Sequence, residues 1–253
     1  MPTSLSLGEV PAPNPGPNDV VISMHAAALN HRDLFLRQHL YPAPSFDTPL
    51  LADGYGTVTA TGASAKSWMG KNVILVPGQG WKDSPEGPEA PGGYAIYGGT
   101  KTIPIGTLQE LVCVNQSEVE EAPAHLSPAE AAALPLTGLT GWRALVTKSG
   151  NAQAGRNILV TGIGGGVALN VLQFAAALGA NVYVTSGNQE KITKAKALGA
   201  KGGVNYKDEA WEKDLKKQLP KDRPYIDGII DGAGGNLMAK ATRLLKVCFH
   251  SSS

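Results

Sequence analysis

The alternation of apolar and polar positions changes character partway along the chain. Up to about residue 120, short alternating or β-branched runs are separated by Gly- and Pro-rich turns. Such runs predict short strands in a compact, mostly antiparallel β domain. The runs are DVVISMHA (19–26), GTVTATG (56–62), NVILVPG (72–78) and LQELVCVN (108–115). Residues 77–101 predict a long loop, which is more often functional or mobile than structural.

From about residue 123 the pattern predicts alternating helices and strands. Ser127 can cap a helix that begins with Pro128, and Glu130 completes a capping box. Apolar strands, each followed by a helical segment, come next: NILVT (157–161), VYVTS (182–186), GGVNY (202–206) and IDGIIDGAGG (226–235). Unbroken apolar strands are typical of parallel sheets covered on both faces. The fold class is therefore α/β, with a β domain at 1–122 and a doubly wound parallel sheet at 123–253.

Two of the predicted helices carry apolar stripes that we expect to face the core. The stripes are Val167, Val171, Phe174 and Leu178 on one helix, and Trp211, Leu215 and Leu219 on the other. On the second helix, Glu209–Lys213 and Glu212–Lys216 are spaced for ion pairs on a solvated face.

Composition narrows the function classes. The 253 residues are 42% apolar and 17% charged, with 22 Lys plus Arg against 21 Asp plus Glu. A nearly neutral chain without a basic face does not favour nucleic-acid binding. Two cysteines, Cys113 and Cys248, are too few for a disulfide framework and are expected to be inert thiols in a reducing compartment. Neither a secretory segment nor an apolar run of roughly 20 residues is present, so we expect a cytoplasmic protein without a membrane partner.

The stretch NILVTGIGGGVALNVLQFAAALGA (157–180) suggests a phosphate-binding turn. Glycine permits the tight turn after the first strand, and a second glycine lets the backbone approach a pyrophosphate at the helix N-terminus. Gly162 and Gly164 fit these two positions. The third is Val167, with Gly165 and Gly166 just before it. We expect a dinucleotide at this turn, with a purely structural glycine turn as the alternative.

The end of the second predicted strand bears on which dinucleotide binds. An NAD site places a carboxylate there for the ribose hydroxyls. The sequence has Ser186, Asn188 and Lys191 instead, and Glu190 is expected on the solvated side of the next helix. Hydroxyl, amide and ammonium groups suit a 2′-phosphate, so NADPH/NADP is favoured over NADH.

With these motifs in place, the chain resembles the medium-chain dehydrogenase/reductase superfamily. It is most similar to the zinc-independent quinone oxidoreductases and their zinc-type alcohol dehydrogenase-like relatives. The matching segments include VPAPNPGPNDVVISMHAAALNHRDL, PLLADGYGTV, LQELVCV, AHLSPAEAAALPLTGLTGWRAL, VTGIGGGVALNVLQFAAALGA and ALGAKGGVNY. The resemblance implies an N-terminal GroES-like β domain, a Rossmann domain and a cofactor held in the cleft between them.

The resemblance also implies that the chain lacks catalytic zinc. Zinc-dependent relatives carry a cysteine where Asn30 stands, a histidine close to Ala52 and a third ligand near Pro135 or Leu136. None of these residues offers the thiolate, imidazole or carboxylate that zinc requires. The four-cysteine structural lobe is absent, and His31 and Asp53 are expected to be polar scaffold.

In the quinone oxidoreductases the matching segment places an Asn, an Asp and a Tyr at the substrate end of the cleft. Asn30, Asp33 and Tyr41 match these three, while Phe35 replaces a second family tyrosine. The resemblance implies that Asn30 orients the substrate and that Tyr41 donates a hydrogen bond or proton. The alternatives are that Asp33 caps a short helix and that Tyr41 only packs.

Three further cofactor contacts follow from the resemblance. Thr140 is expected near the nicotinamide, Tyr206 near the adenosine phosphate and Gly234 after the fourth strand. Each has a structural alternative, respectively a helix residue, a strand-end aromatic residue and a turn glycine.

The two ends of the chain differ from those of the family. Family members continue past LLK with further strands and a tail, and their first strand precedes EVPAPNPGP. We therefore expect an incomplete Rossmann sheet, an exposed fourth strand and loss of the family homodimer. Two interpretations remain: an NADPH-dependent reductase of quinones, enones or related carbonyl compounds, or a non-catalytic NADPH-binding or regulatory protein, such as an inactive truncated form.

Overall fold

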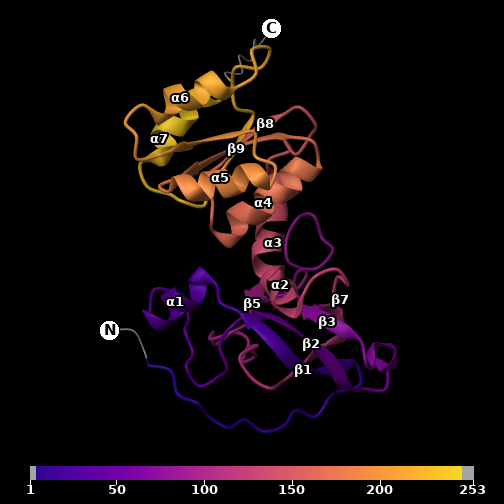
Figure 1. Cartoon of the computed structure of the whole chain (residues 1–253). Helices are drawn as coiled ribbons and strands as arrows, with labels where there is room; N and C mark the ends of the chain where they lie inside the picture. Colours follow the sequence, from indigo (N-terminus) through magenta and orange to yellow (C-terminus); the bar gives the residue numbers. More distant parts are fainter. Residues whose placement is uncertain (1–3, 247–253) are drawn as a thin grey trace. The chain divides into compact units, whose positions relative to one another are not determined.

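A computed structural model describes residues 4–246, which form two compact units (Figure 1). The units are Met1–Leu136 and Thr137–Ser253, so the division falls within helix α3 (Pro135–Trp142) and later than the predicted boundary at 122/123. Helix α2 (Pro128–Ala133) accounts for the difference, because it packs against the strands of the first unit. Ser127 and Glu130 form the predicted capping box at the start of α2. Among the described residues, no helix is long and apolar enough to cross a membrane.

The first unit is built on an antiparallel sheet, as predicted. Its strands are β1 (Asp19–Ala28), β2 (Asp53–Thr61), β3 (Asn72–Leu75), β6 (Leu111–Asn115) and β7 (Val119–Glu121), in the order β6-β1-β2-β3-β7. Alternate side chains of these strands form one core that includes Val20, Ile22, Val58, Val73 and Val112, all nearly inaccessible. Helix α1 (His31–Arg37) follows β1 directly, so it lies where that strand ends.

Short elements complete the first unit. They are η1 (Lys66–Trp68), η2 (Gln116–Glu118), β4 (Gly78–Gln79) and β5 (Ala95–Ile96), the last two pairing at the base of the predicted 77–101 loop. The loop is held by its own polar contacts, because the Glu89 carboxylate accepts hydrogen bonds from the backbone of Lys82, Asp83 and Ser84 at 2.6–2.8 Å. Those bonds lower the pKa of Glu89 to about 2.

The second unit is the predicted parallel sheet. Its strands are β8 (Asn157–Val160), β9 (Asn181–Ser186), β10 (Gly202–Asn205) and β11 (Gly228–Ile230), in the order β10-β9-β8-β11. Its helical elements are η3 (Arg143–Lys148), α4 (Gly166–Ala177), α5 (Gln189–Ala197), α6 (Trp211–Gln218), α7 (Leu237–Ala241) and η4 (Thr242–Leu244). The strand order reverses beside β8, and ligands of doubly wound sheets bind at such a reversal.

Helices cover both faces of the parallel sheet (Figure 1). Ile158 and Val160 of β8 pack in one core with α4 and α5, while Leu159 packs in a second core with α6 and α7. Trp211, Leu215 and Leu219 are buried as predicted. The stripe on α4 ends earlier than predicted: Leu178 is 39% exposed because the helix has already ended at Ala177.

The predicted ion pairs on α6 do not form. Lys217 pairs with Asp214, and Glu212 lies 3.9 Å from Arg243. Glu209 precedes the first turn of α6, so it cannot face Lys213 across a helical turn.

Strand β11 is partly covered on its outer side, where an exposed edge was predicted. The backbone amide of Ile226, two residues before β11, donates to the Leu244 carbonyl at 2.7 Å, and the amide of Lys246 donates back to Ile226 at 3.0 Å. These bonds place residues 244–246 parallel to the entry of β11.

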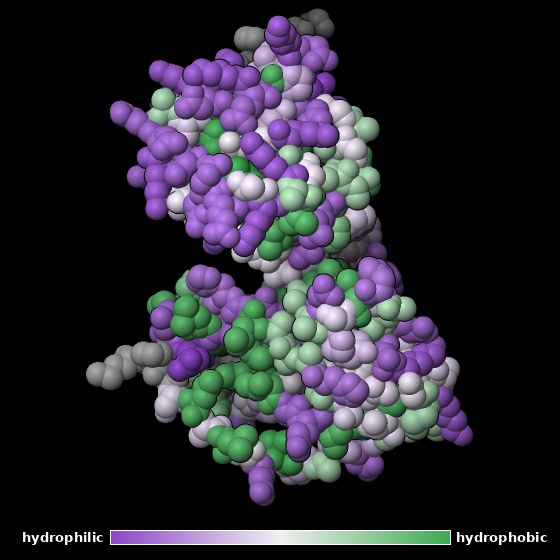
Figure 2. All heavy atoms as spheres, viewed as in Figure 1, coloured by the Kyte–Doolittle hydropathy of each residue, from purple (hydrophilic) through white to green (hydrophobic). Residues whose placement is uncertain are grey.

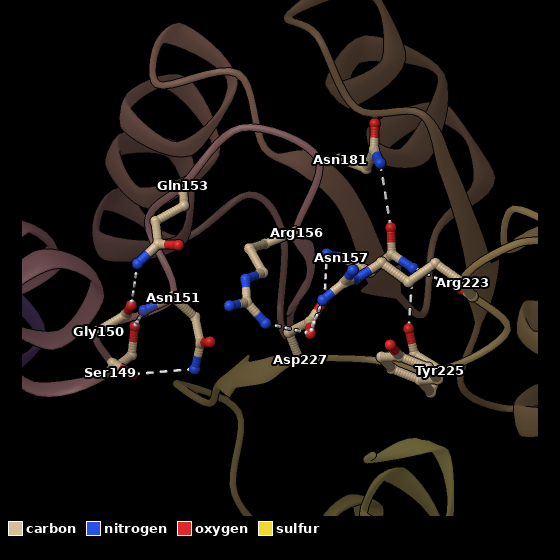
Figure 3. Close-up of polar contacts among 10 residues, drawn as sticks. All are labelled: Ser149, Gly150, Asn151, Gln153, Arg156, Asn157, Asn181, Arg223, Tyr225 and Asp227. Atoms are coloured by element: carbon tan, nitrogen blue, oxygen red, sulfur yellow. Dashed lines mark hydrogen bonds and ion pairs between the residues drawn. The ribbon is translucent and has the colours of Figure 1, made fainter.

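A polar cluster fixes the amino ends of the parallel strands (Figure 3). The Asp227 carboxylate accepts from Arg223 Nε at 2.7 Å, from an Arg156 nitrogen at 3.1 Å and from the Asn157 backbone amide at 2.8 Å. The fully buried Asn157 side chain donates to the carbonyls of Arg223 and Tyr225, both at 2.8 Å. The cluster therefore joins β8 to the segment that leads into β11.

Candidate functional site

The glycine turn joins β8 to α4 in a conformation that requires glycine. Gly162 has φ +64° and Gly164 has φ +112°, values that residues with a Cβ rarely adopt. Gly165 is the N-cap of α4 and has no side chain to cap the helix. The first amides of α4, from Gly166 onward, have no acceptor within the helix and carry the positive end of its dipole. The turn thus offers backbone donors to an anion.

A cavity of about 450 Å³ opens beside this turn at the carboxyl ends of β8 and β9. It is lined by Gly162, Ile163, Gly164, Gly165, Ser186, Gly187, Asn188, Lys191, Tyr206 and Lys207. The structure therefore brings together seven of the predicted cofactor residues: Gly162, Gly164, Gly165, Ser186, Asn188, Lys191 and Tyr206. Two lining residues are cationic and none is acidic.

Lys191 lies directly across the glycine turn. A Cβ added at Gly164 would meet its side chain, with Cδ at 2.8 Å and Nζ at 3.1 Å. Lys191 is in the first turn of α5, whose N-cap Asn188 accepts hydrogen bonds from the amides of Glu190 and Lys191. Glu190 points to an exposed ion pair with Lys194 at 2.7 Å. Glu190 therefore lies on the solvated side of α5, as expected from the sequence.

Ser186 and Asn188 make structural hydrogen bonds in the loop between β9 and α5. Ser186 is only 5% exposed, and its Oγ accepts from the Asn188 amide at 3.2 Å. The side-chain oxygen Oδ1 of Asn188 caps α5. These two side chains shape the loop after β9, and what they can still offer a ligand is the serine O–H and the asparagine N–H₂.

Tyr206 and Lys207 approach the cavity from the end of β10. A Cβ at Gly187 would lie 2.9 Å from both the Tyr206 hydroxyl and Lys207 Cε. The sequence analysis singled out Tyr206 but not Lys207. Lys207 could have been found from topology, because the residues after β10 lie at the same sheet edge as those after the neighbouring β9.

The remaining predicted contacts lie around the turn. Gly234 has φ +67° in the turn after β11, where its amide donates to Asp231, and Ala233 lies 3.2 Å from where a Gly162 Cβ would be. Thr140 is exposed on α3 and does not line the cavity. Thr137, which the sequence analysis did not select, lies against Gly166 and accepts from Asn170 at 3.0 Å.

In the first unit, Asn30 is tied to a buried carboxylate. Asn30 Nδ2 donates to Asp53 Oδ2 at 2.8 Å, and the Leu136 backbone amide donates to Asp53 Oδ1 at 2.9 Å. Asp53 is inaccessible, and the Thr107 hydroxyl donates to its backbone carbonyl at 2.7 Å. Burial raises the pKa of Asp53 to about 6, against the lowering effect of the bonds from Asn30 and Leu136.

Asp33 is a helix-capping residue. Its carboxylate accepts from the Asn30 backbone amide at 2.7 Å in the capping box of α1 and contacts Arg32 at 3.3 Å. Burial raises its pKa above the ordinary value. The Asp33 side chain therefore caps α1, which is the alternative that the sequence analysis gave beside a catalytic role.

Arg32 organises the surroundings of Tyr41. Its guanidinium lies 4.8 Å from the centre of the half-buried Tyr41 ring, a cation–π distance. It also donates to the carbonyls of Tyr97 and Gly98 at 2.9 and 3.1 Å. Tyr41 is therefore held by a buried cation that also anchors the far end of the 77–101 loop.

The residues around Asn30 do not fit a zinc ion. Ala52 has no donor atom, Asn30 Nδ2 is committed to Asp53, and both Asp53 oxygens accept hydrogen bonds. Zinc needs several thiolate, imidazole or carboxylate ligands around one point. Within residues 4–246 no group of three such side chains comes together.

Comparison with known proteins gives the family. Residues 16–124 match the alcohol dehydrogenase GroES-like domain, and residues 166–247 match the zinc-binding dehydrogenase domain. The chain is 53% identical to the zinc-type alcohol dehydrogenase-like protein YogA of Leptosphaeria maculans, over 96% of this chain and 70% of YogA. It is 31% identical to the mitochondrial NAD(P)H oxidoreductase RTN4IP1 of Danio rerio, over 91% of this chain but only 57% of that protein.

Solved structures agree with the two-unit architecture. A structure described as an NAD-dependent alcohol dehydrogenase has TM-score 0.84 and 33% identity, covering 94% of this chain and 69% of that one. A quinone oxidoreductase of Pseudomonas syringae pv. Tomato DC3000 has TM-score 0.73 and 28% identity, covering 94% and 65%. The predicted fold class, a GroES-like domain followed by a Rossmann-type sheet, is confirmed. The chain belongs to the zinc-type alcohol dehydrogenase-like family of the medium-chain dehydrogenase/reductases.

Proposed function

We propose that this chain is an NADPH-dependent oxidoreductase that transfers hydride, without zinc, to a quinone, an enone or a related carbonyl compound. The observation that carries the proposal is the cavity at the glycine turn, which combines uncapped helix amides with Lys191 and Lys207 and has no acidic lining residue. Membership of an oxidoreductase family and relatives named for NAD and NAD(P)H support a nicotinamide cofactor.

The cofactor would lie along the turn. Amides from Gly164 to Val167 would hold the pyrophosphate, as helix N-termini do. Lys191, Lys207 and the Tyr206 hydroxyl would surround the 2′-phosphate, with Ser186 and Asn188 as secondary donors. When bound, NADPH supplies a hydride to the electron-poor carbon of the substrate.

On the substrate side, Asn30 and Tyr41 offer the polar groups. The Asn30 amide would donate a hydrogen bond to the substrate carbonyl oxygen, where negative charge develops as hydride arrives. Tyr41 or a water molecule would supply the proton that completes reduction. Asp33 would act indirectly, by fixing the first turn of α1. Thr140 and Gly234, which lie outside the cavity lining, remain proposed cofactor contacts.

The surface of the first unit favours an apolar substrate. Figure 2 shows apolar residues gathered on the face of this unit, while the visible face of the second unit is largely hydrophilic. Next to Asn30, Leu29 is 82% exposed, and Leu40 beside Tyr41 is 67% exposed. Phe35 and Phe46 are also exposed. Apolar surface of this kind around polar anchors suits a ring or alkyl chain that carries one carbonyl group.

The cofactor assignment can be tested by fluorescence titration with NADPH and NADH. Wild type is expected to prefer NADPH, and K191Q/K207Q is expected to lose about 100-fold in NADPH affinity, because two charge-assisted contacts disappear, with little change for NADH. K194Q is the matched control, since Lys194 pairs with Glu190 outside the cavity. A decisive wild-type preference for NADH would overturn the assignment.

Catalysis is tested by NADPH oxidation with a panel of quinones and enones. Turnover with any member of the panel supports the oxidoreductase. Tight NADPH binding without oxidation of any acceptor would instead select a non-catalytic NADPH-binding or regulatory protein.

A further inference from the structure

While Asp53 is ionised, its hydrogen bond with Asn30 can run in one direction only. An ionised carboxylate only accepts hydrogen bonds, and both Asp53 oxygens are engaged, one by Asn30 Nδ2 and one by the Leu136 amide. The nitrogen end of the Asn30 amide must therefore face Asp53. Its second N–H and its carbonyl oxygen are fixed in consequence, although Asn30 itself is half-buried at the start of α1.

A fixed orientation of the Asn30 amide is useful for catalysis. A primary amide has a donor end and an acceptor end of almost equal shape, so packing alone does not choose between them. A substrate carbonyl oxygen, by contrast, needs a donor at one particular place.

We propose that Asp53 is a positioning residue that acts through Asn30: by accepting from Nδ2 it selects the amide orientation that presents an N–H to the substrate carbonyl. The inference rests on the proposed function, in which Asn30 contacts the substrate. Asp53 does not touch the substrate, because it is inaccessible to solvent.

The substitution D53N isolates this role. The Leu136 amide still needs an acceptor, so the new carboxamide must turn its oxygen toward Leu136 and its nitrogen toward Asn30. Asn30 must then rotate by half a turn to present its oxygen. Both hydrogen bonds of residue 53 survive and a buried charge disappears, while every donor and acceptor of Asn30 is exchanged, including the one that faces the Asp33 amide in the capping box of α1.

The experiment compares D53N with T107V. T107V removes the hydroxyl that bonds the Asp53 backbone carbonyl and leaves its carboxylate untouched, which makes it a matched control for disturbance at the same buried residue. We expect kcat of D53N to fall at least tenfold, with unchanged NADPH affinity and no loss of thermal stability. T107V should lower the melting temperature and keep kcat within twofold. A D53N enzyme with kcat within twofold of wild type would overturn the proposal.

The double variant N30D/D53N covers the case in which D53N does not fold. It restores a donor–acceptor pair with the roles exchanged, so the need for an N–H at position 30 can be tested in a folded protein. The proposal predicts recovery of stability alone, because position 30 then has only acceptors at neutral pH. Recovered kcat would contradict it.

Amide orientation has a readout that does not require turnover. In wild type, one side-chain amide proton of Asn30 should be shifted downfield in NMR spectra by its bond to the carboxylate, and the shift should vanish in D53N but persist in T107V. A wild-type protein without NADPH oxidation would refute the proposed function while leaving this orientation test valid. An unshifted Asn30 proton in wild type would refute the orientation itself.

Discussion

Two buried aspartates, one in each unit, behave in opposite ways. Asp227 lies among two arginines and the Asn157 amide, and although burial alone would raise its pKa, these partners lower it to about 2. Asp53 is fully inaccessible and accepts only from neutral donors, so burial dominates and raises its pKa to about 6. The charged form of aspartate is thus stabilised at position 227 and destabilised at position 53.

The difference separates a structural site from a candidate active site. Asp227 joins the start of β8 to the segment that leads into β11, at the amino ends of the parallel strands (Figure 3). The cavity at the glycine turn lies at the opposite, carboxyl ends. Asp53 carries a cost of burial without a cation in direct contact, and its carboxylate meets a residue proposed to contact the substrate. Carboxylates with raised pKa concentrate at functional sites, which fits this assignment.

The largest expected effect is a loss of stability on replacing the structural aspartate, Asp227. D227N removes the carboxylate from Arg223 and Arg156 and turns an N–H₂ toward cations. Because the Arg156 and Arg223 side chains are 34% and 26% exposed, we expect the free energy of unfolding to fall by about 3 kcal/mol, the lower end for a broken buried pair. Urea denaturation measures it. D214N, which breaks the exposed pair with Lys217, should cost less than about 0.5 kcal/mol.

The pH dependence of stability should show the two aspartates with opposite signs. Because the pKa of Asp53 is raised, the native state binds the Asp53 proton more tightly than the unfolded state does. The resulting stabilisation, about 3 kcal/mol, is fully present below pH 3.8 and is lost as pH rises through about 6. The lowered pKa of Asp227 gives the reverse: about 2 kcal/mol, present above pH 3.8 and lost as pH falls through about 2.

Difference curves isolate each group from the other carboxylates. The unfolding free energy of wild type minus that of D53N should decline as pH rises from 4 to 7. The unfolding free energy of wild type minus that of D227N should decline as pH falls below 4. Parallel curves for wild type and D53N from pH 4 to 7 would show that Asp53 titrates normally.

The smallest expected effect concerns the glycine turn. G164A forces a residue with a Cβ to φ +112° and against the Lys191 side chain. We expect a stability loss of about 1–2 kcal/mol from the strained backbone, with NADPH affinity reduced at least tenfold because the turn can no longer approach a pyrophosphate. G150A, at a positive-φ glycine outside the cavity, should lose similar stability and keep its NADPH affinity.

Local patterns accounted for most of the fold. Apolar runs located β1, β2, β3 and β6 of the antiparallel sheet and all four strands of the parallel sheet, but not the short strand β7. The Ser127–Glu130 spacing located the start of α2. The glycine turn was predictable because backbone conformations such as those at Gly162 and Gly164 leave a direct mark on residue type.

What escaped the sequence depends on partners distant along the chain. Leu136 bonds Asp53 across 83 residues, and Lys207 reaches the cavity only because β10 lies beside β9. The role of Asp33 as a helix cap was open because one carboxylate can serve a helix or a reaction equally well.

The sequence by itself determined the two architectures, the family and the position of the glycine turn, because these rest on periodicity and on the conformations that glycine, proline and capping residues allow. Only the tertiary structure decided that Asp53 is buried against Asn30 and that Asp227 is buried between arginines. Burial and charge partners set a carboxylate's pKa, and both are properties of the folded neighbourhood rather than of the residue.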